Sequence, residues 1–344
     1  MIVDDSIVAR TVISRILEGN DAFDVVATAG HAGEALDLLA RVQVDIILLD
    51  VEMPGLDGLT ALPDLLARSH GARVLIVSSA AADGAVATVR ALTLGAADTL
   101  LKPGAGSFAG RFASVLTERL LRIGHAPEAA TAPIPVAEPA EPTLAPAAHG
   151  PVGCLAIGAS TGGLHALSDF FQELPRDFAA PILVTQHLPP VFMPYFASQL
   201  MEIAGRQAHV AEDGMRLVPG ELFVAPGDGH LGLVRNRGSV RIRIDRNPAP
   251  TGCLPSVDPM FAAVASVFGA GAVAVVLTGM GRDGLIGARD VAAQGGEVLA
   301  QDSRTSVVWG MPGAVANAGL AAAVLSPGQL AQRIAKRGGA AAWN

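Results

Sequence analysis

The stretch from Val152 to Gly163, with the sequence VGCLAIGASTGG, constrains the fold of this chain more than any other. Its apolar first half is typical of a buried strand, and the glycines that follow favour a tight turn. Apolar residues after Thr161 recur at helical spacing. Ser160 is therefore expected between a strand and a helix, where free backbone N–H groups favour negative charge. A hydroxyl there can attack a carbonyl carbon, and nearby amides can stabilise the resulting oxyanion.

Two other interpretations of this turn remain open. The turn resembles the G-x-G-x-x-G pattern of dinucleotide-binding domains, although Ser160 replaces the middle glycine and hinders close approach of a pyrophosphate. The serine could also cap the following helix without any chemical role.

The composition and charge of the chain exclude several classes of protein. No apolar run among the 344 residues approaches the ~18 residues of a membrane span, so no membrane insertion is expected. No secretory signal pattern opens the sequence, and Cys154 and Cys253 fit no disulfide or metal motif, so a cytoplasmic protein is expected. Net charge is −5 over residues 1–124, −3 over 125–150 and zero over 151–344, so no nucleic-acid partner is expected.

Residues 1–124 are predicted to form one α/β domain with a doubly wound parallel sheet, because short apolar runs alternate with helical patterns. The predicted strands are Ile2–Val3, Val25–Ala27, Ile46–Leu49, Val74–Val77 and Thr99–Leu101. Five polar residues follow these runs, namely Asp4, Asp5, Asp50, Ser78 and Lys102. Ligands bind at the carboxyl ends of such strands, and three clustered carboxylates suit Mg²⁺.

On these residues the segment resembles the flavodoxin-like receiver domain of bacterial response regulators. The matching motifs are VDDS (3–6), LLDVEMPGLDG (48–58), VSS (77–79) and LLKP (100–103). The resemblance implies phosphorylation at Asp50, Mg²⁺ binding by Asp4, Asp5, Asp50 and the backbone carbonyl of Glu52, and phosphate contacts by Ser78 and Lys102.

Two features depart from the receiver pattern. Only Met1–Val3 precede the acidic pair, so an upstream apolar run is expected to lengthen the first strand. Thr99 stands where receivers usually carry an aromatic switch residue. This replacement is expected to affect how the domain transmits phosphorylation, but not phosphorylation itself.

Residues 125–150 are predicted to be a semi-stiff linker, since they contain six prolines and nine alanines and no apolar period. Residues 151–344 are predicted to form a second doubly wound α/β domain, with an antiparallel insertion at Gly214–Asp245. Further strands are expected at Pro181–Gln186, Ala272–Leu277, Glu297–Gln301 and Gly319–Leu325.

Ser160, His187 and Asp283 each come after a predicted strand, at one edge of the sheet if the strands are parallel. Serine needs a base to take its proton, and an imidazole base needs a carboxylate to orient it. Taken singly, His187 could be structural and Asp283 a turn residue. His165 and the pair Asp228 and His230 are rival candidates. Without an HExxH motif or a tight His/Cys cluster, no metal is expected for this chemistry.

Here the chain resembles the catalytic domain of chemotaxis protein-glutamate methylesterases, the CheB family. The matching motifs are GASTGG (158–163), QHLPPVF (186–192), VAPGDGHL (224–231), PSVDPMF (255–261), LTGMGRDG (277–284) and VVWGMPG (307–313). The resemblance implies a Ser160 nucleophile, a His187 general base and acid, an orienting Asp283, and Thr161 and Met280 lining the oxyanion site. One departure is Gly252-Cys253-Leu254, where many relatives carry a basic His-Arg pair.

The resemblance implies a phosphorylation-activated hydrolase that demethylates glutamate methyl esters on chemoreceptors and deamidates receptor glutamines. It implies a histidine kinase as phosphodonor, Mg²⁺ for the receiver and no cofactor for hydrolysis. A same-family esterase in a non-motility chemosensory pathway stays open, as does a response regulator with a non-catalytic binding output domain.

Overall fold

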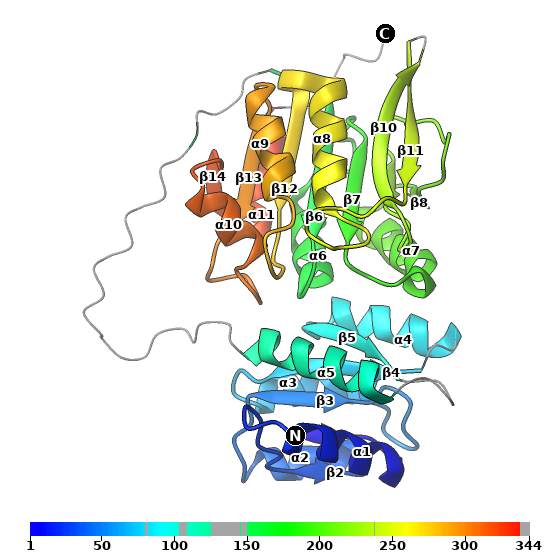
Figure 1. Cartoon of the computed structure of the whole chain (residues 1–344), viewed down its shortest axis with the longest axis vertical. Coiled ribbons are helices and arrows are strands. Elements are labelled where there is room, and N and C mark those ends of the chain that lie inside the picture. The colour runs from blue at the N-terminus through cyan, green and yellow to red at the C-terminus, as the bar shows by residue number, and fades with distance from the viewer. Residues whose placement is uncertain (80–81, 103–108, 125–144, 146–149, 237, 338–344) are drawn as a thin grey trace, which may run out of the picture. The chain divides into compact units, whose positions relative to one another are not determined.

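The computed structural model describes residues 1–79, 82–102, 109–124, 145, 150–236 and 238–337 (Figure 1). The chain divides into two compact units, Met1–Pro127 and Glu128–Asn344. Apart from Ala145 and Gly150, the predicted linker 125–150 lies outside the described residues, as does Pro103 of the LLKP motif.

The first unit contains a five-stranded parallel sheet with the strand order β2-β1-β3-β4-β5. This order is that of flavodoxin-like doubly wound folds, as predicted. The strands are β1 (Ile2–Val3), β2 (Thr28–Ala29), β3 (Ile46–Leu49), β4 (Arg73–Ser78) and β5 (Asp98–Leu101). The helices that alternate with them are α1 (Ile7–Glu18), α2 (Ala32–Leu39), α3 (Gly58–Arg68), α4 (Ala82–Thr93) and α5 (Ala109–Gly124).

The second strand lies at Thr28–Ala29 and not at Val25–Ala27, where the apolar run predicted it. Its position follows from β1, whose two residues Ile2 and Val3 pair with Thr28 and Ala29. A cavity of about 440 Å³ lies at the start of the chain, and Met1, Phe23 and Val25 help to line it. The Met1 ammonium donates a hydrogen bond to the Ile46 carbonyl at 2.8 Å, and burial lowers its pKa to about 6. The expected upstream run stays a prediction.

The second unit contains a seven-stranded parallel sheet with the order β14-β13-β12-β6-β7-β9-β8. Its strands are β6 (Cys154–Ala159), β7 (Ile182–Gln186), β8 (Ala208–Val210), β9 (Leu222–Val224), β12 (Ala272–Val276), β13 (Glu297–Gln301) and β14 (Ala323–Leu325). Its α-helices are α6 (Gly163–Glu173), α7 (Met193–Ala204), α8 (Val257–Phe268), α9 (Leu285–Ala293), α10 (Met311–Asn317) and α11 (Pro327–Ala335). Two short 3₁₀ helices span Pro190–Phe192 and Gly269–Gly271.

The predicted antiparallel insertion at Gly214–Asp245 is only partly antiparallel. Strands β10 (His230–Asn236) and β11 (Ser239–Asp245) do form an antiparallel hairpin. Leu222–Val224 instead joins the main sheet as β9, parallel to β7 and β8. Its three side chains are fully buried, so the run carries no alternation that would reveal the direction of its neighbours.

One hydrophobic core joins the sheet of the second unit to the elements that cover it. Residues of the hairpin, such as Leu231 and Ile242, pack with Phe261 of α8 and with Leu183 and Val276 of the sheet. In Figure 1, α8 and α9 lie in front of the strands that carry the site described below. At the N-terminus of α8, Val257 packs against Gly158 of β6.

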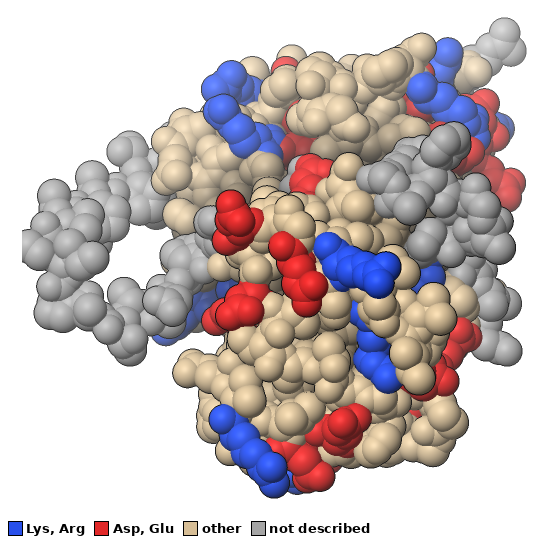
Figure 2. All heavy atoms as spheres, turned by 60° about the horizontal axis from the view of Figure 1, so that its bottom comes forward, with Lys and Arg blue, Asp and Glu red and all other residues tan. Residues whose placement is uncertain are grey.

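Among the described residues, no helix is both long and apolar enough to cross a membrane. Figure 2 shows acidic and basic side chains scattered among the described residues of one face, with both signs present.

Candidate active site

The turn after β6 is held by hydrogen bonds to both neighbouring strands. The Ser160 N–H donates to the Thr278 carbonyl at 3.0 Å, and the Gln186 side-chain amide donates to the Ser160 carbonyl at 2.8 Å. Thr278 follows β12 and Gln186 ends β7, so the serine backbone is fixed by the sheet itself. As predicted, Ser160 lies between strand β6 and helix α6.

Close packing explains the two glycines of this turn. Gly162 is the N-cap of α6, with a φ of 76° that favours glycine. A Cβ atom on Gly163 would lie 2.2 Å from Oε1 of Gln186, and one on Gly162 would lie 2.5 Å from a Val307 methyl. The glycines therefore admit neighbouring side chains, which does not favour the dinucleotide interpretation. Because Gly162 is the N-cap residue, the N-cap interpretation of Ser160 is wrong.

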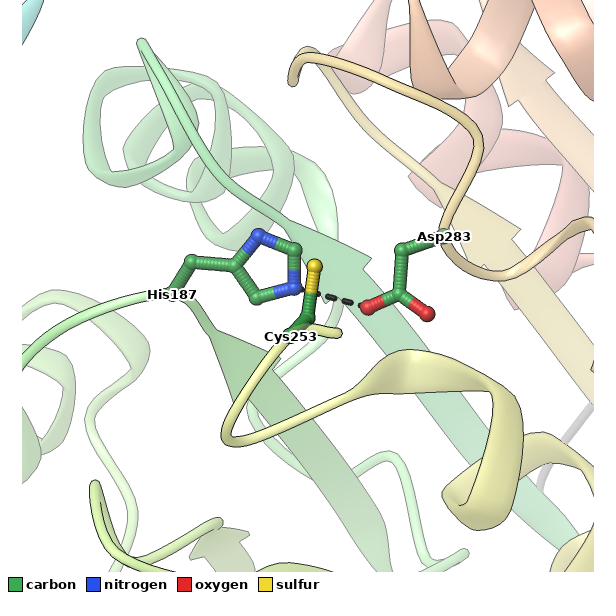
Figure 3. A group of neighbouring side chains, drawn as sticks. All are labelled: His187, Cys253 and Asp283. Atoms are coloured by element: carbon green, nitrogen blue, oxygen red, sulfur yellow. Dashed lines mark hydrogen bonds and ion pairs between the residues drawn. The ribbon is translucent and has the colours of Figure 1, made fainter. Parts of the chain in front are cut away.

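His187 and Asp283 form a hydrogen-bonded pair beside this turn (Figure 3). His187 directly follows β7, and its backbone N–H donates to the Ala159 carbonyl at 3.3 Å. Its Nε2 lies 2.7 Å from Oδ2 of Asp283, which belongs to the turn between β12 and α9. Strands β6, β7 and β12 are adjacent in the sheet, which is why residues far apart in sequence meet here.

The Asp283 carboxylate is 1% exposed and is surrounded by donors. Its oxygens accept hydrogen bonds from the Ser256 hydroxyl at 2.7 Å, the Val257 N–H at 2.8 Å and the Gly284 N–H at 3.1 Å. Val257 is the first residue of α8, so the positive end of the helix dipole also faces this carboxylate. Burial acts to raise the pKa of Asp283, but the bonds to His187, Val257 and Ser256 outweigh it and lower the pKa to about 2.

His187 is held as an imidazolium by its neighbours. Burial acts to lower its pKa, but hydrogen bonds with Asp283 and with the Cys253 thiol outweigh this effect and raise the pKa to about 9. A ring with this pKa must lose its proton before it can act as a base. Because Nε2 contacts Asp283, Nδ1 is the nitrogen left to exchange a proton with a substrate or nucleophile.

A second buried carboxyl group, that of Asp258, lies next to Asp283. Burial, together with the negative charge of Asp283, raises the pKa of Asp258 to about 6 despite a hydrogen bond from the Gly287 N–H. A carboxyl group in this position carries a proton more readily than one in water, because two adjacent carboxylates repel each other.

The sequence analysis included the PSVD motif but assigned no roles to its residues Ser256 and Asp258. It also did not predict that Cys253 lies beside His187. Ser256 and Asp258 lie at the start of a predicted helix. Free backbone N–H groups at such a helix start can donate to a carboxylate, so this position could have indicated both residues. Nothing local indicates Cys253, which a loop brings into the site.

Thr161 and Met280, the two residues predicted to line the oxyanion site, lie in the turns after β6 and β12. Thr161 is 7% exposed, and its carbonyl accepts a hydrogen bond from the Thr278 hydroxyl at 2.9 Å. Met280 is half-buried in the turn after β12. Within the described residues the Ser160 hydroxyl forms no hydrogen bond, so its proton transfer to His187 and the oxyanion role of these amides stay predictions.

Of the rival candidates, His230 lies beside the site, whereas Asp228 and His165 are exposed. His230 is 2% exposed, and both ring nitrogens face backbone atoms, since Nδ1 accepts from the Ser256 N–H and Nε2 lies 2.9 Å from the Asn247 carbonyl. Asp228 pairs at the surface with Arg246. His165 lies on α6, exposed to solvent.

The first unit carries an acidic cluster at the carboxyl ends of β1 and β3. Ligand oxygens of Asp4, Asp5 and Asp50 lie within 4.8 Å of one another. The Lys102 ammonium lies 2.6 Å from Asp50 and 2.9 Å from Asp4. Burial raises the pKa of Asp50, and the hydrogen bond from Lys102 opposes this. One ammonium against three carboxylates leaves excess negative charge, so the residues present fit an oxygen-liganded divalent cation such as Mg²⁺.

The other predicted residues of this cluster are close by. The Glu52 N–H donates to Asp50 Oδ1 at 3.1 Å, and its side chain accepts from the Ser79 hydroxyl at 2.7 Å. The buried Ser78 hydroxyl accepts a hydrogen bond from Thr88 at 2.8 Å. Thr99 is 2% exposed, and its hydroxyl has no partner among the described residues.

Comparisons with known proteins agree with both units. Residues 155–334 match the family model described as CheB methylesterase, and residues 1–107 match that of the response regulator receiver domain. A Caulobacter vibrioides protein named protein-glutamate methylesterase/protein-glutamine glutaminase 2 is 44% identical over 98% of both chains. A Rhodopseudomonas palustris protein named protein-glutamate methylesterase/protein-glutamine glutaminase is 40% identical over 98% of this chain and 93% of its own.

A solved structure also matches the second unit. The Thermotoga maritima CheB methylesterase catalytic domain is 38% identical, with a TM-score of 0.52, and covers 54% of this chain and 98% of that one. Fold, site and comparisons together define a response regulator whose output domain is a hydrolase built on a parallel sheet flanked by helices. The chain belongs to the CheB methylesterase family.

Proposed function

We propose that this chain hydrolyses γ-methyl esters of glutamate on chemoreceptors and deamidates receptor glutamines, under the control of its receiver domain. The observation that carries this proposal is the Asp283–His187 pair, 2.7 Å apart with its carboxylate buried, beside the Ser160 turn. Relatives that match nearly the whole chain carry names for both activities.

In the proposed reaction, the Ser160 hydroxyl attacks the ester carbonyl carbon and gives its proton to Nδ1 of His187. The bond to the methoxy oxygen then breaks, and His187 returns the proton to form methanol. Water next gives a proton to His187 and attacks the acyl carbon, which releases glutamate and restores the serine hydroxyl. Asp283 orients the ring and stabilises its charged form throughout. With a glutamine substrate the leaving group is ammonia.

The carbonyl oxygen becomes negatively charged in each attack. The backbone amides of Thr161 and Met280 are proposed to donate to it, because both residues flank the turns that meet at Ser160. Fixed donors at such a point stabilise a developing charge without reorganising. No cofactor is required for these steps.

Asp50 is proposed as the phosphate acceptor of the receiver, with a histidine kinase as phosphodonor. Asp4, Asp5, Asp50 and the backbone carbonyl of Glu52 would hold Mg²⁺, with Lys102 and Ser78 contacting the phosphoryl group. The bound ion supplies charge neutralisation of the phosphoryl oxygens. Phosphorylation is proposed to shift the population of chains whose active site is uncovered, so that the chain acts on the cytoplasmic part of the receptors.

The test is methanol release from membranes that carry methylated receptors, with and without a small-molecule phosphodonor and Mg²⁺. We expect release that the phosphodonor accelerates and that Ser160→Ala abolishes. Methanol release by Ser160→Ala at the rate of the unaltered chain would reject the serine mechanism. No release from the unaltered chain would favour a non-catalytic binding output domain.

The same assay separates the two pathways left open. Receptors purified from a chemotaxis cluster and from a second chemosensory cluster are compared as substrates. Preference for the second set would assign the enzyme to a non-motility pathway.

A further inference from the structure

A third side chain completes a ligand set around His187 and Asp283. Cys253 extends from the loop between β11 and α8 toward the histidine ring (Figure 3). One ring nitrogen, the thiol sulfur and one carboxylate oxygen all lie within 4.8 Å of one another. Within the described residues, the other group of three such side chains is the acidic Asp4, Asp5 and Asp50 cluster, which has only oxygen ligands.

The types of these atoms determine which ion they suit. Nitrogen, sulfur and oxygen at one point are ligands of Zn²⁺, with bond lengths of ~2.0 Å to ~2.3 Å. Ligands at those lengths around a tetrahedral ion lie ~3.3 Å to ~3.8 Å apart, so small movements of the three side chains would bring them to a common ion. A thiolate disfavours Mg²⁺ and Ca²⁺, which prefer oxygen.

The surroundings supply what a zinc site needs beyond its ligands. Asp283 is held by the Ser256 hydroxyl and the Val257 N–H, and such support of ligating groups strengthens metal binding. Cys253 and His187 are both partly exposed, which gives an ion a route from solvent. Three protein ligands leave a fourth position for water.

We propose that His187, Cys253 and Asp283 form an inhibitory binding site for Zn²⁺. Binding releases the thiol proton and the imidazolium proton to solvent, and the ion takes the place of the hydrogen bond between His187 and Asp283. With the Nε2 electron pair bound to the ion and the remaining ring proton on Nδ1, His187 cannot accept the Ser160 proton at Nδ1, and the relay to Ser160 stops. The inhibition rests on the proposed function, whereas the metal site itself does not.

The first experiment detects the site by spectroscopy, using Co²⁺ as a probe in the full chain with excess Mg²⁺ to occupy the acidic cluster. We expect one Co²⁺ per chain, with a thiolate-to-cobalt charge-transfer band and the intense visible bands of a tetrahedral site. Addition of Zn²⁺ should displace the Co²⁺ ion and so remove both the charge-transfer band and the visible bands. The bands should persist in Ser160→Ala, which lacks the nucleophile, so this readout holds even if no substrate is cleaved.

Cysteine variants assign the thiolate. Cys253→Ser should abolish the charge-transfer band, whereas Cys154→Ala should keep it, because Cys154 is fully buried in β6. Circular dichroism and the melting temperature establish that each variant is folded. Absence of the band in the unaltered chain, or its persistence in Cys253→Ser, would overturn the proposal.

The second experiment measures inhibition of methanol release in the absence of a phosphodonor. Zn²⁺ should inhibit the unaltered chain, and a chelator should restore its rate. Half-inhibition of Cys253→Ala, measured relative to its own zinc-free rate, should require at least ~10-fold more Zn²⁺ than half-inhibition of the unaltered chain. Equal sensitivity of both proteins would contradict the site. Inhibition that only a thiol reductant reverses would point to oxidation of Cys253 and would also overturn it.

Discussion

Each unit gathers carboxylates at the carboxyl edge of a parallel sheet, but the two groups are neutralised in different ways. In the first unit, Asp4, Asp5 and Asp50 face a single ammonium, that of Lys102, and Asp5 is exposed. In the second unit, the pair Asp258 and Asp283 is buried and lies among backbone N–H groups, a serine hydroxyl and an imidazole.

The difference between the two groups determines what each can do. A partly buried cluster with excess negative charge, open to solvent at Asp5, attracts a divalent cation and then an incoming phosphoryl group. A buried pair with enough donors keeps one carboxylate ionised and fixed, which suits it to orient a histidine. The corresponding sheet edge is therefore suited to phosphate chemistry in one unit and to proton transfer in the other.

The largest expected effect comes from neutralising the orienting carboxylate. Asp283→Asn should lower kcat for methanol release by ~10⁴-fold, because an amide no longer stabilises the charged ring or fixes its tautomer. Single-turnover methanol release measures this loss, with circular dichroism as the folding control. A rate near that of the unaltered chain would mean that another group orients His187.

The pH dependence of the same step tests the state of the histidine. His187 must be neutral to act as a base, and its pKa of about 9 lies above neutrality. kcat/KM should therefore rise ~tenfold per pH unit between pH 7 and 8 and level off above the pKa. Cys253→Ser removes the thiol contact that raises this pKa and should shift the profile to lower pH. Both profiles are recorded with a chelator, and a flat profile would contradict the ion pair.

The role of the acidic cluster in the first unit is tested by its effect on the hydrolytic rate of the second unit. Beryllofluoride with Mg²⁺ should accelerate methanol release on the order of tenfold, a usual size for coupling between sites. Asp50→Asn, or removal of Mg²⁺, should abolish this acceleration, since the phosphoryl mimic needs both. Equal acceleration in Asp50→Asn would contradict phosphorylation control.

The smallest expected effect is on stability, at Asp258. Its pKa is 3.8 in the unfolded chain and about 6 in the folded one, so the folded state binds more protons between these values. Stability contributed by this group therefore falls as pH rises from about 4 to 6. Asp258→Asn removes that loss and should stabilise the second unit by up to roughly 3 kcal/mol above pH 6. Denaturant unfolding at pH 4 and 7.5 measures it, and an equal gain at both values would exclude titration as the cause.

The ends of buried parallel strands could be predicted from sequence because each apolar run stops at a polar residue. That pattern located Asp50 after β3, Ser160 after β6 and His187 after β7. Strand β9 could not be assigned in this way, because its direction depends on β7 and β8, which are distant in sequence.

Residues that reach the site from a loop were beyond sequence reasoning. Cys253 reaches His187 only because the segment between β11 and α8 folds back across the sheet edge. Ser256 and Asp258 depend on where the first turn of α8 points, which the core beneath that helix decides. Neither the path of this loop nor the direction of the first turn of α8 can be predicted from a local sequence pattern.

The backbone of Ser160 is bonded to Thr278 on one side and to Gln186 on the other. The proposed nucleophile thus belongs to the rigid framework of its own unit, and displacing it would require separating β6 from its neighbours. Phosphorylation of the receiver is therefore expected to change the access of substrate to Ser160. The catalytic geometry can stay the same in the silent and the active enzyme.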